Sequence, residues 1–293
     1  MSDMLIIGCS RGKHLSRPMA KKLKASHLDL YVNKFPDDEL YIRFKSDLRG
    51  KYVVLVQSFY GSISDCVLEV IFAAKTAYEL GAKNVALVAP YFPYMRQDKR
   101  FHEGEVVSQS VLASLMDDCF DSIIAIDPHF HRKSSLQDIF KTGSRCLTAN
   151  SLIAGYIKEH IKSPIIVGPD EESYKWAKNV ADMIAAQSTI LKKTRHSSYS
   201  VSVRMDKKIG FRGRNAVIVD DIVSTGHTIL ETAKILHKLG AIKVHCICVH
   251  GIFANNALDK LKKSGISVIS TNTIPNKAAK IDVSGLLAAS LDI

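Results

Sequence analysis

A short segment in the second half of the chain combines two acidic residues with small hydroxyl-bearing residues. Asp220 and Asp221 end the apolar run NAVIVDD, and the loop Ser-Thr-Gly begins after only two further apolar residues. A carboxylate is costly to bury without a partner, so both aspartates require a polar partner or access to solvent. Something polar is therefore expected to meet them at this point of the chain.

The loop after the aspartates has the composition of an anion-binding site. A loop that enters a helix N-terminus presents free N–H groups and the positive end of the helix dipole. Glycine lets the backbone approach an anion closely, and the hydroxyl groups beside it add donors. The candidate residues are Ser224, Thr225, Gly226, His227 and Thr228.

A phosphorylated sugar would satisfy both halves of this segment. Two carboxylates beside a phosphate repel it unless they face sugar hydroxyls or a Mg²⁺ ion carried by the ligand. The plainer alternative is an ordinary strand–helix turn with an N-cap Ser or Thr and solvated aspartates. The order Asp-Asp, two apolar residues, Ser-Thr-Gly and Thr favours the phosphate site.

Length and composition indicate a soluble protein of two domains. The chain has 293 residues, and single cores rarely grow beyond about 250 to 300 residues. It is 46% hydrophobic and 24% charged, and no apolar run approaches the roughly 20 residues of a membrane-spanning helix. We expect a cytoplasmic protein with no membrane partner. The six cysteines are scattered without a CxxC pair, so we expect them to be reduced, with Cys246 and Cys248 in the core.

The charge balance favours an anionic partner. The chain carries 40 Lys and Arg against 29 Asp and Glu, a formal net charge of +11. Charge alone does not distinguish nucleic acid, acidic lipid and polyphosphate. The sequence has no aromatic-rich basic stripe, so a nucleic-acid-binding module is the weaker interpretation and no nucleic acid partner is expected.

Apolar runs alternate with helical patterns along the whole chain. Each run has few residues, is rich in Val and Ile, and is bounded by turn residues. The runs are MLIIG, YVVLVQ, NVALVAPY, SIIAID, SPIIVGPD, NAVIVDD, KVHCICVHG and ISVIST. This alternation predicts the α/β class, with strands in a mostly parallel sheet that is covered by helices on both faces.

Two long segments repeat one another. Residues 52–92 and 215–253 each contain a strand, a loop, an amphipathic helix, a Leu-Gly-Ala stop and a second strand. Gly81 and Gly240 are expected in the left-handed conformation that ends a helix. The first copy has a longer loop and no Ser-Thr-Gly cradle, so one site is expected, in the second half. A polar stretch at 141–150 places the boundary, which gives domains 1–145 and 146–293.

At this point the chain resembles the phosphoribosyl diphosphate binding motif of type I phosphoribosyltransferases and of ribose-phosphate diphosphokinases, or PRPP synthases. Six further groups of residues resemble segments of the PRPP synthases in the order of that family. They are KFPDDELYIRF, YFPYMRQDKRF, AIDPHF, VGPDEES, LKKTRHS, and HGIFANNAL with STNTIP. The resemblance implies two similar phosphoribosyltransferase-like domains, each a mostly parallel sheet flanked by helices.

The resemblance also implies an ATP site in the first half. An aromatic ring beside an amide and an arginine suits adenine and phosphate. The implied ATP-binding residues are Phe35, Asp37, Asp38, Glu39, Arg96 and Gln97. In the family the first of these segments reaches ATP across a subunit interface, so a homo-oligomer with a shared active site is implied. Taken alone, FPDDE is also a plausible surface turn.

The family's metal-binding segments match Asp127, His129 and Asp170. These residues are implied to bind Mg²⁺, which prefers oxygen ligands and keeps its waters, so His129 could also act from an outer shell. The spacing of His129 and His131 would alternatively suit zinc, but no third or fourth ligand is apparent nearby.

By the same resemblance, Lys193 and Arg195 match the family's catalytic Lys-x-Arg pair. The implied reaction transfers the β,γ-diphosphoryl group of ATP to the C1 hydroxyl of ribose 5-phosphate, giving PRPP and AMP for nucleotide biosynthesis. A cationic loop or hairpin can neutralise the charge on the transferred group. The bland alternative is a solvated polar hairpin. Asp220 and Asp221 are then implied to bind the ribose 2- and 3-hydroxyls, and residues 224–228 the 5-phosphate.

Four residues depart from the family pattern. His227 stands where the family commonly has Gly, and a non-glycine residue at positive φ costs about 1 kcal/mol. Glu171 and Glu172 bring negative charge towards the expected diphosphate, and Asp38 replaces the Gly of FPDGE. These departures leave a second hypothesis, a catalytically weak or silent relative that binds nucleotides or regulates a partner.

Overall fold

The computed structural model describes residues 3–130, 132–133, 135–171, 173–195, 201–205 and 209–291. The chain forms two compact units, one made of Met1–Leu147 with Val283–Ile293 and the other of Thr148–Asp282. The boundary therefore lies two residues beyond the predicted one, and the carboxyl-terminal segment belongs to the first unit, not to the second as predicted. None of the described helices is long and apolar enough to cross a membrane.

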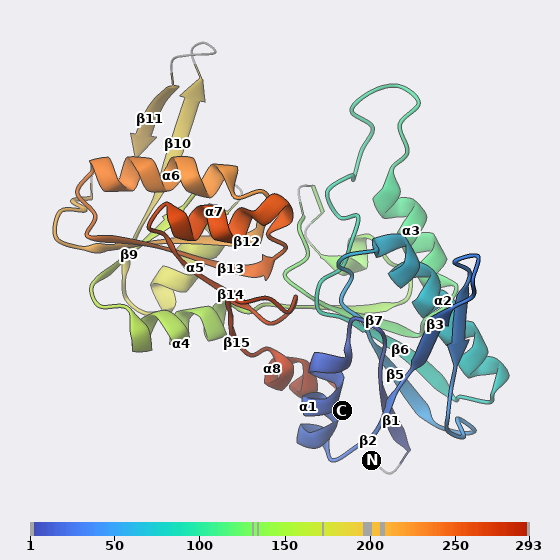
Figure 1. Cartoon of the computed structure of the whole chain (residues 1–293). Coiled ribbons are helices and arrows are strands. Elements are labelled where there is room, and N and C mark those ends of the chain that lie inside the picture. The colour runs from blue at the N-terminus through green and yellow to red at the C-terminus, as the bar shows by residue number, and fades with distance from the viewer. Residues whose placement is uncertain are drawn as a thin grey trace. The chain divides into compact units, whose positions relative to one another are not determined.

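The first unit contains a parallel sheet with the strand order β2-β1-β5-β6-β7-β8. Its strands are β1 (Met4–Gly8), β2 (Ser26–Asp29), β5 (Tyr52–Val56), β6 (Asn84–Ala89), β7 (Ser122–Ile126) and β8 (Gly143–Leu147). Its helices are α1 (Lys13–Leu23), α2 (Ile63–Glu79), α3 (Ser108–Asp117) and α8 (Ser284–Ala289), with a 3₁₀ turn at Leu136–Asp138. Figure 1 shows these helices around the sheet.

A separate two-stranded hairpin projects from the first unit. Its antiparallel strands are β3 (Tyr31–Lys34) and β4 (Leu40–Arg43). The side chains of Val32 and Ile42 pack against the core of the first unit, so one face of the hairpin is anchored. The tip of the hairpin carries the FPDDE residues.

The carboxyl-terminal helix α8 packs against α1 of the first unit. The guanidinium of Arg145 donates a hydrogen bond to the carbonyl oxygen of Ser290, at 2.6 Å. Leu287 and Ala288 of α8 are buried. Burial of this short apolar helix explains why the end of the chain leaves the second unit, to which it is adjacent in sequence.

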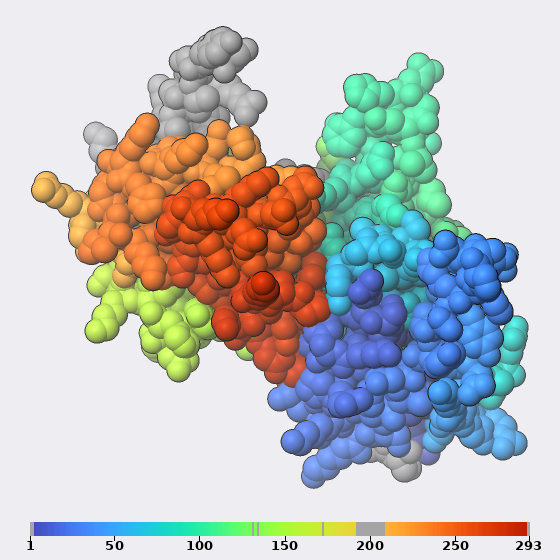
Figure 2. All heavy atoms as spheres, in the orientation of Figure 1, coloured from blue at the N-terminus to red at the C-terminus, as the bar shows by residue number. Residues whose placement is uncertain are grey.

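The second unit contains a seven-stranded sheet with the order β11-β10-β9-β12-β13-β14-β15. All neighbours are parallel except β10 and β11. The strands are β9 (Pro164–Gly168), β10 (Gln187–Arg195), β11 (Val201–Met205), β12 (Asn215–Val223), β13 (Lys243–Gly251), β14 (Ser267–Thr271) and β15 (Ala279–Ile281). The helices are α4 (Asn150–His160), α5 (Tyr174–Met183), α6 (His227–Lys238) and α7 (Ala257–Lys263), with a 3₁₀ turn at Ala254–Asn256. In the view of Figure 2, α6 and α7 form much of the visible surface of this unit.

The predicted α/β class is confirmed, and all eight apolar runs are strands. The strands that the apolar pattern missed are short or polar, for example β2 and β8, which lie at the two edges of the first sheet. An edge strand has a neighbour on one side only and exposes more of its residues, so it lacks the continuous apolar run of a central strand. Cys246 and Cys248 are fully buried in β13, as expected.

The predicted repeat is present as β5–α2–β6 in the first unit and β12–α6–β13 in the second. Gly81 and Gly240 follow the two helices with φ angles of 85° and 90°, as predicted. The amphipathic face of α6 is buried at Ile229, Ala233 and Leu236. The copies therefore share their frame and differ at the turn between strand and helix.

Candidate active site

The two aspartates lie near the end of strand β12, at the carboxyl edge of the second sheet. Each accepts a hydrogen bond from the next backbone N–H: Asp221 N to Asp220 Oδ1 at 3.0 Å, and Ile222 N to Asp221 Oδ1 at 2.7 Å. Asp220 is half-buried and Asp221 is buried. Because successive side chains of a strand point to opposite faces, the two carboxylates can meet different parts of one ligand.

The electrostatics of this strand end favour a cation or hydroxyl donors. Burial raises the pKa of the Asp220 carboxyl well above its usual range, and the charges of Asp221 and Asp170 raise it further. The hydrogen bond from Ser173 opposes this rise in pKa. A further hydroxyl donor or a cation beside Asp220 would therefore stabilise its ionised form.

The loop between β12 and α6 is held open by Gly226. This residue has a φ of 74°, in the left-handed region, and a Cβ there would lie 3.2 Å from Cδ1 of Leu261 in α7. No side chain caps the first turn of α6 by a hydrogen bond. The N–H groups of that turn have no intrahelical partner, so they can bind an anion together with the hydroxyls of Ser224, Thr225 and Thr228.

The expectation that His227 would need a positive φ is wrong. The left-handed residue of this loop is Gly226, whereas His227 is the first residue of α6. Its side chain lies along the helix, with Nε2 3.4 Å from Oε1 of Glu231. The imidazole therefore occupies the solvent side of the first turn, and the backbone of the loop carries no strain at this position.

The loop after β9 joins Asp170 to the aspartates through a residue that the sequence analysis did not single out. The hydroxyl of Ser173 lies 2.7 Å from Asp170 Oδ1 and 2.8 Å from Asp220 Oδ1. The N–H of Ser173 also donates to Asp170 Oδ1, at 2.8 Å. The signal in the sequence was a serine three residues after an aspartate, directly before a helix. Glu171 is exposed, and Glu172 lies outside the described residues.

Lys193 and Arg195 lie on β10, which pairs with β11 in an antiparallel hairpin. Lys193 is opposite Val203, and Arg195 is opposite Val201. The predicted hairpin is therefore present in the described backbone. It starts from the edge of the same sheet that contains β12.

The expected ATP residues of the FPDDE segment form the turn between β3 and β4. Phe35 N donates to Glu39 O at 2.8 Å, and Asp38 N donates to Phe35 O at 3.0 Å. Asp38 has a φ of 69°, which explains why a glycine suits this position and why an aspartate is tolerated there. The ring of Phe35 is 49% exposed and contacts Tyr41 edge-on, with centroids 5.5 Å apart. Its free face is available for stacking.

Arg96 and Gln97 lie in the loop between β6 and α3. Gln97 Oε1 accepts a hydrogen bond from Ser108 Oγ at 2.8 Å, which ties the loop to the start of α3. Arg96 is exposed. The adjacent Asp98 pairs with Arg132, and its second carboxylate oxygen is buried without a hydrogen-bond partner. Asp98 is a further polar residue of this segment that the sequence analysis left out.

The remaining expected metal residues, Asp127 and His129, follow β7 in the first unit. Asp127 is buried, has a φ of 37°, and donates its N–H to Leu147 O at 2.9 Å. Among the described residues no group of three or more His, Cys, Asp or Glu side chains is arranged to hold a metal ion. His131, which entered the zinc alternative, lies outside the described residues.

The structure thus groups the expected ribose 5-phosphate residues in the second unit. Asp220, Asp221, Asp170 and the loop 224–228 lie at the carboxyl ends of neighbouring strands β12 and β9. The expected ATP residues lie in the first unit. The carboxyl edge of a parallel sheet is where such folds bind ligands.

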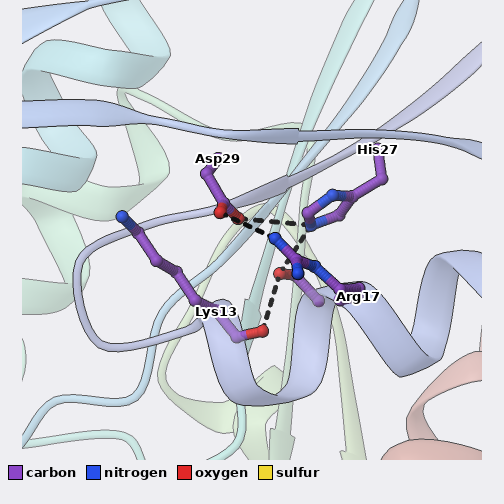
Figure 3. Close-up of polar contacts among 5 residues, drawn as sticks. Lys13, Arg17, His27 and Asp29 are labelled. Carbon is purple, nitrogen blue, oxygen red and sulfur yellow. Dashed lines mark hydrogen bonds and ion pairs between the residues drawn. The ribbon is translucent and has the colours of Figure 1, made fainter.

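A second polar cluster in the first unit resembles a catalytic triad only in composition. Figure 3 shows His27 and Asp29 of β2 beside Lys13 and Arg17 of α1. Ser16 Oγ lies 3.0 Å and Asp29 Oδ1 3.4 Å from the same ring nitrogen of His27, Nε2. A triad requires the serine and the carboxylate at different ring nitrogens. The cluster instead links α1 to the edge strand β2 by polar contacts.

The fold and the strand-end loop define a protein built from two domains of the phosphoribosyltransferase type. A family model described as the N-terminal domain of ribose phosphate pyrophosphokinase matches residues 4–119, and one described as the phosphoribosyl transferase domain matches residues 135–285. The chain belongs to the ribose-phosphate pyrophosphokinase family.

Full-length relatives carry the same conclusion. A ribose-phosphate pyrophosphokinase of Methanothermobacter thermautotrophicus is 35% identical over 286 residues, covering 97% of this chain and 98% of that protein. One of Saccharolobus solfataricus is 32% identical over 294 residues, covering 98% and 100%. The crystal structure of phosphoribosylpyrophosphate synthetase from Mycobacterium smegmatis matches with a TM-score of 0.85 and 26% identity, covering 98% and 97%. The predicted family and fold class are confirmed, and a silent relative is not favoured.

Proposed function

We propose that the protein is a ribose-phosphate diphosphokinase, which transfers the β,γ-diphosphoryl group of ATP to the C1 hydroxyl of ribose 5-phosphate. The products are PRPP and AMP. The observation that carries the proposal is the end of β12, where two carboxylates directly precede an open glycine loop at a helix N-terminus. This arrangement offers acceptors for sugar hydroxyls and donors for a phosphate, in a chain that family members match over nearly its whole length.

In this proposal Asp220 and Asp221 accept hydrogen bonds from the ribose 2- and 3-hydroxyls. Ser224, Thr225 and Thr228, with the N–H groups from Gly226 to Thr228, bind the 5-phosphate. Support comes from the left-handed Gly226 and from the lack of a side-chain cap on α6. His227 leaves the phosphate pocket to the backbone, because its ring is directed to Glu231.

The implied Mg²⁺ is tested by the chemistry of the donors. Asp170 and Asp220 present carboxylate oxygens on either side of one hydroxyl. Such a set of hard oxygen donors with an excess of negative charge fits Mg²⁺. When bound, Mg²⁺ would neutralise charge on the diphosphoryl oxygens. Asp170 would hold it in the second unit, and Asp127 and His129 are the proposed metal residues of the first.

For ATP we propose that Phe35 stacks on the adenine while Asp37, Asp38 and Glu39 accept hydrogen bonds from its polar atoms. Arg96 and Gln97 supply a charge and an amide to the same nucleotide. Half of the Phe35 ring is exposed at the tip of a hairpin, a position from which it can reach a second copy of the chain. A homo-oligomer with a shared active site and a cytoplasmic location remain predictions.

Lys193 and Arg195 are proposed as the catalytic pair. Phosphoryl transfer requires positioning and neutralisation of spreading negative charge more than covalent chemistry. A hairpin at the edge of the sheet that carries β12 can bring two cations to the diphosphoryl group. Their role is to stabilise the charge that develops as the group leaves AMP and bonds to the C1 oxygen.

Phosphorus NMR of the purified protein with ATP, Mg²⁺ and ribose 5-phosphate tests the proposal. We expect AMP and PRPP to appear together in equal amounts. Binding of the substrates without turnover would instead establish the silent relative. The variant Lys193→Ala should lose about 10³-fold or more in turnover, whereas Lys192→Ala, at the preceding position of β10, is the matched control. Equal rates for these two variants would remove Lys193 from the mechanism.

A further inference from the structure

Ser173 contacts two carboxylates from different segments of the second unit. Its Oγ lies 2.7 Å from Asp170 Oδ1, in the loop after β9, and 2.8 Å from Asp220 Oδ1, at the end of β12. The residue is buried, with 4% of its surface exposed. No other described side chain is shown to hydrogen-bond to both carboxylates.

The hydrogen-bond arithmetic makes this contact sensitive to what binds nearby. A serine hydroxyl has one hydrogen to donate, and two carboxylate oxygens compete for it. Each of those oxygens has one further donor, the N–H of Ser173 for Asp170 and the N–H of Asp221 for Asp220. The hydroxyl is therefore the only group in this pattern that both carboxylates share. Without it no hydrogen-bonding group would join the two carboxylates, whose charges repel each other.

The backbone around Ser173 fixes the position of its hydroxyl. Gly168 ends β9 so close to α5 that an added Cβ would lie 2.8 Å from Cα of Tyr174. Ser173 is the N-cap of α5, and its carbonyl oxygen accepts the N–H of Ala177 at 3.1 Å. The N-cap position and the close contact between β9 and α5 therefore fix the backbone of Ser173. Its hydroxyl has little freedom to move if either carboxylate shifts.

We propose that Ser173 is a positioning residue that locks Asp170 and Asp220 into one geometry, so that metal binding at Asp170 and ribose binding at Asp220 support each other. The proposal rests on the proposed function for the ligands of the two aspartates. We assign Ser173 no direct contact with a substrate, because the residue is buried and its only hydroxyl hydrogen is directed to the carboxylates. It acts by holding the two acidic groups at a fixed separation.

The test compares Ser173→Ala with Ser173→Thr, which restores the hydroxyl. Isothermal calorimetry of ribose 5-phosphate with and without Mg²⁺ gives the affinity and its dependence on the metal. We expect Ser173→Ala to weaken ribose 5-phosphate binding in the presence of Mg²⁺ by about 10- to 100-fold, the range for losing a hydrogen bond to a charged group. The gain in affinity from adding Mg²⁺ should shrink, because Ser173→Ala removes the contact that couples the two sites.

Two further measurements separate positioning from general stability. The matched control Ser264→Ala removes an exposed hydroxyl of the same unit, which donates only to Lys260 O at 3.0 Å, and should change neither affinity. The KM for ATP at saturating Mg²⁺ should stay within about twofold in all three variants, since the proposed ATP residues lie in the first unit. In the Asp220→Asn background, Ser173→Ala should add little further loss, as expected when one residue acts through the other.

Equal ribose 5-phosphate affinity in wild type and Ser173→Ala, or an undiminished effect of Mg²⁺, would overturn the proposal. Failure of Ser173→Thr to recover affinity in a protein with wild-type unfolding would do the same. Because calorimetry needs no turnover, this result is separate from the outcome of the NMR assay. A wild type that makes no PRPP would disprove the proposed function, while the affinity comparison would still decide the role of Ser173.

Discussion

In the first unit β5 enters α2 through Gln57 and Ser58, whereas in the second unit β12 enters α6 through Asp220, Asp221 and a short glycine loop. The first turn is closed by hydrogen bonds to a carboxylate of α2, two of them from the loop after β1. The carboxylate of Glu69 accepts Ser10 N at 2.7 Å, Ser10 Oγ at 2.5 Å and Gln57 Nε2 at 3.2 Å. In the second turn no described side chain caps the first N–H groups of α6, so these groups can bind a ligand.

Counted back from the glycine that follows each helix, Glu69 of α2 corresponds to Thr228 of α6. Where the second unit offers a hydroxyl in the first turn of a helix, the first unit has a buried carboxylate, 2% exposed. Burial raises the pKa of Glu69, and its hydrogen bonds oppose that rise. A carboxylate at this place would repel a phosphate, so the difference teaches that one strand–helix frame can be either a structural lock or a ligand site.

The sharpest way to break the comparison is Asp220→Asn. We expect turnover to fall by about 10³-fold, because the amide has one acceptor oxygen in place of two and no negative charge for the ribose hydroxyls. Stability should be unchanged or higher, since burial and Asp221 raise the pKa of Asp220 and the neutral amide avoids that cost. Steady-state kinetics and urea unfolding give both quantities.

Asp182→Asn is the control for that change. Asp182 is an exposed carboxylate of α5, and its Oδ2 pairs with Lys178 Nζ at 2.7 Å. It should keep wild-type turnover and lose little stability, because exposed helical pairs are worth only about 0.5 kcal/mol. Similar kinetics for both variants would show that Asp220 is no more than a structural residue, like its counterpart in the first unit.

For Glu69→Ala in the first unit we expect the opposite result, a loss of stability without a loss of ligand binding. Its three donors would lose their acceptor inside the protein, which should cost about 3 kcal/mol of unfolding free energy. The affinity for ribose 5-phosphate should not change. Urea unfolding measures the loss, and Glu79→Ala, an exposed glutamate at the end of the same helix, is the control. A weaker ribose 5-phosphate affinity would mean that the first turn also serves a ligand.

A histidine of the second unit should make the unfolding free energy depend on pH. His245 of β13 is buried, and burial followed by the charge of Lys243 lowers its pKa to about 4, from 6.5. The corresponding strand β6 has Ala86 at this place. A depressed histidine pKa means that the unfolded chain binds the proton first, so the contribution is complete above pH 6.5 and is lost as the pH falls towards 4.

From pH 7 to pH 5 this group should remove about 2 kcal/mol of unfolding free energy. The variant His245→Gln should show a shallower decline over the same range. Unfolding by urea at several pH values measures the slope, with the substitution His160→Gln, at an exposed helix end, as the control. Parallel declines for wild type and His245→Gln would exclude His245 as the source.

The smallest effect is expected for Gly226→Ala. A non-glycine residue at this φ of 74° costs about 1 kcal/mol, and the added Cβ must also displace Leu261. The KM for ribose 5-phosphate should rise severalfold, because the loop that binds the phosphate moves. The control Gly213→Ala has a similar φ of 76° with no atom near its Cβ, so it should show the strain without the change in KM. Equal KM values for both would show that the loop geometry is not used in binding.

Much of the fold could be predicted from local sequence. The central strands are continuous Val and Ile runs because both of their faces are buried, and the glycines after α2 and α6 mark the ends of the repeated helices. The candidate residues of the second unit could be predicted because they are close in sequence to a strand end. Edge strands such as β8 were missed because their exposed residues follow no apolar pattern.

Other features depend on residues that are distant in sequence. The unstrained backbone at His227 depends on a turn that places the positive φ at Gly226, where Leu261 of α7 leaves little room for a Cβ. The last helix joins the first unit because its apolar residues find a surface on α1, which no local pattern indicates. Ser173 meets Asp220 across 47 residues of chain, so its role could not be read from spacing.

By itself, the sequence determined the α/β alternation, the internal repeat and the acidic strand end followed by a glycine loop, because each depends on neighbouring residues and their burial. Only the tertiary structure decided that one copy of the repeat is closed by Glu69 and the other is held open with Ser173 between two aspartates. The physical reason is that a carboxylate becomes a lock or a binding group according to the donors that other segments bring to it.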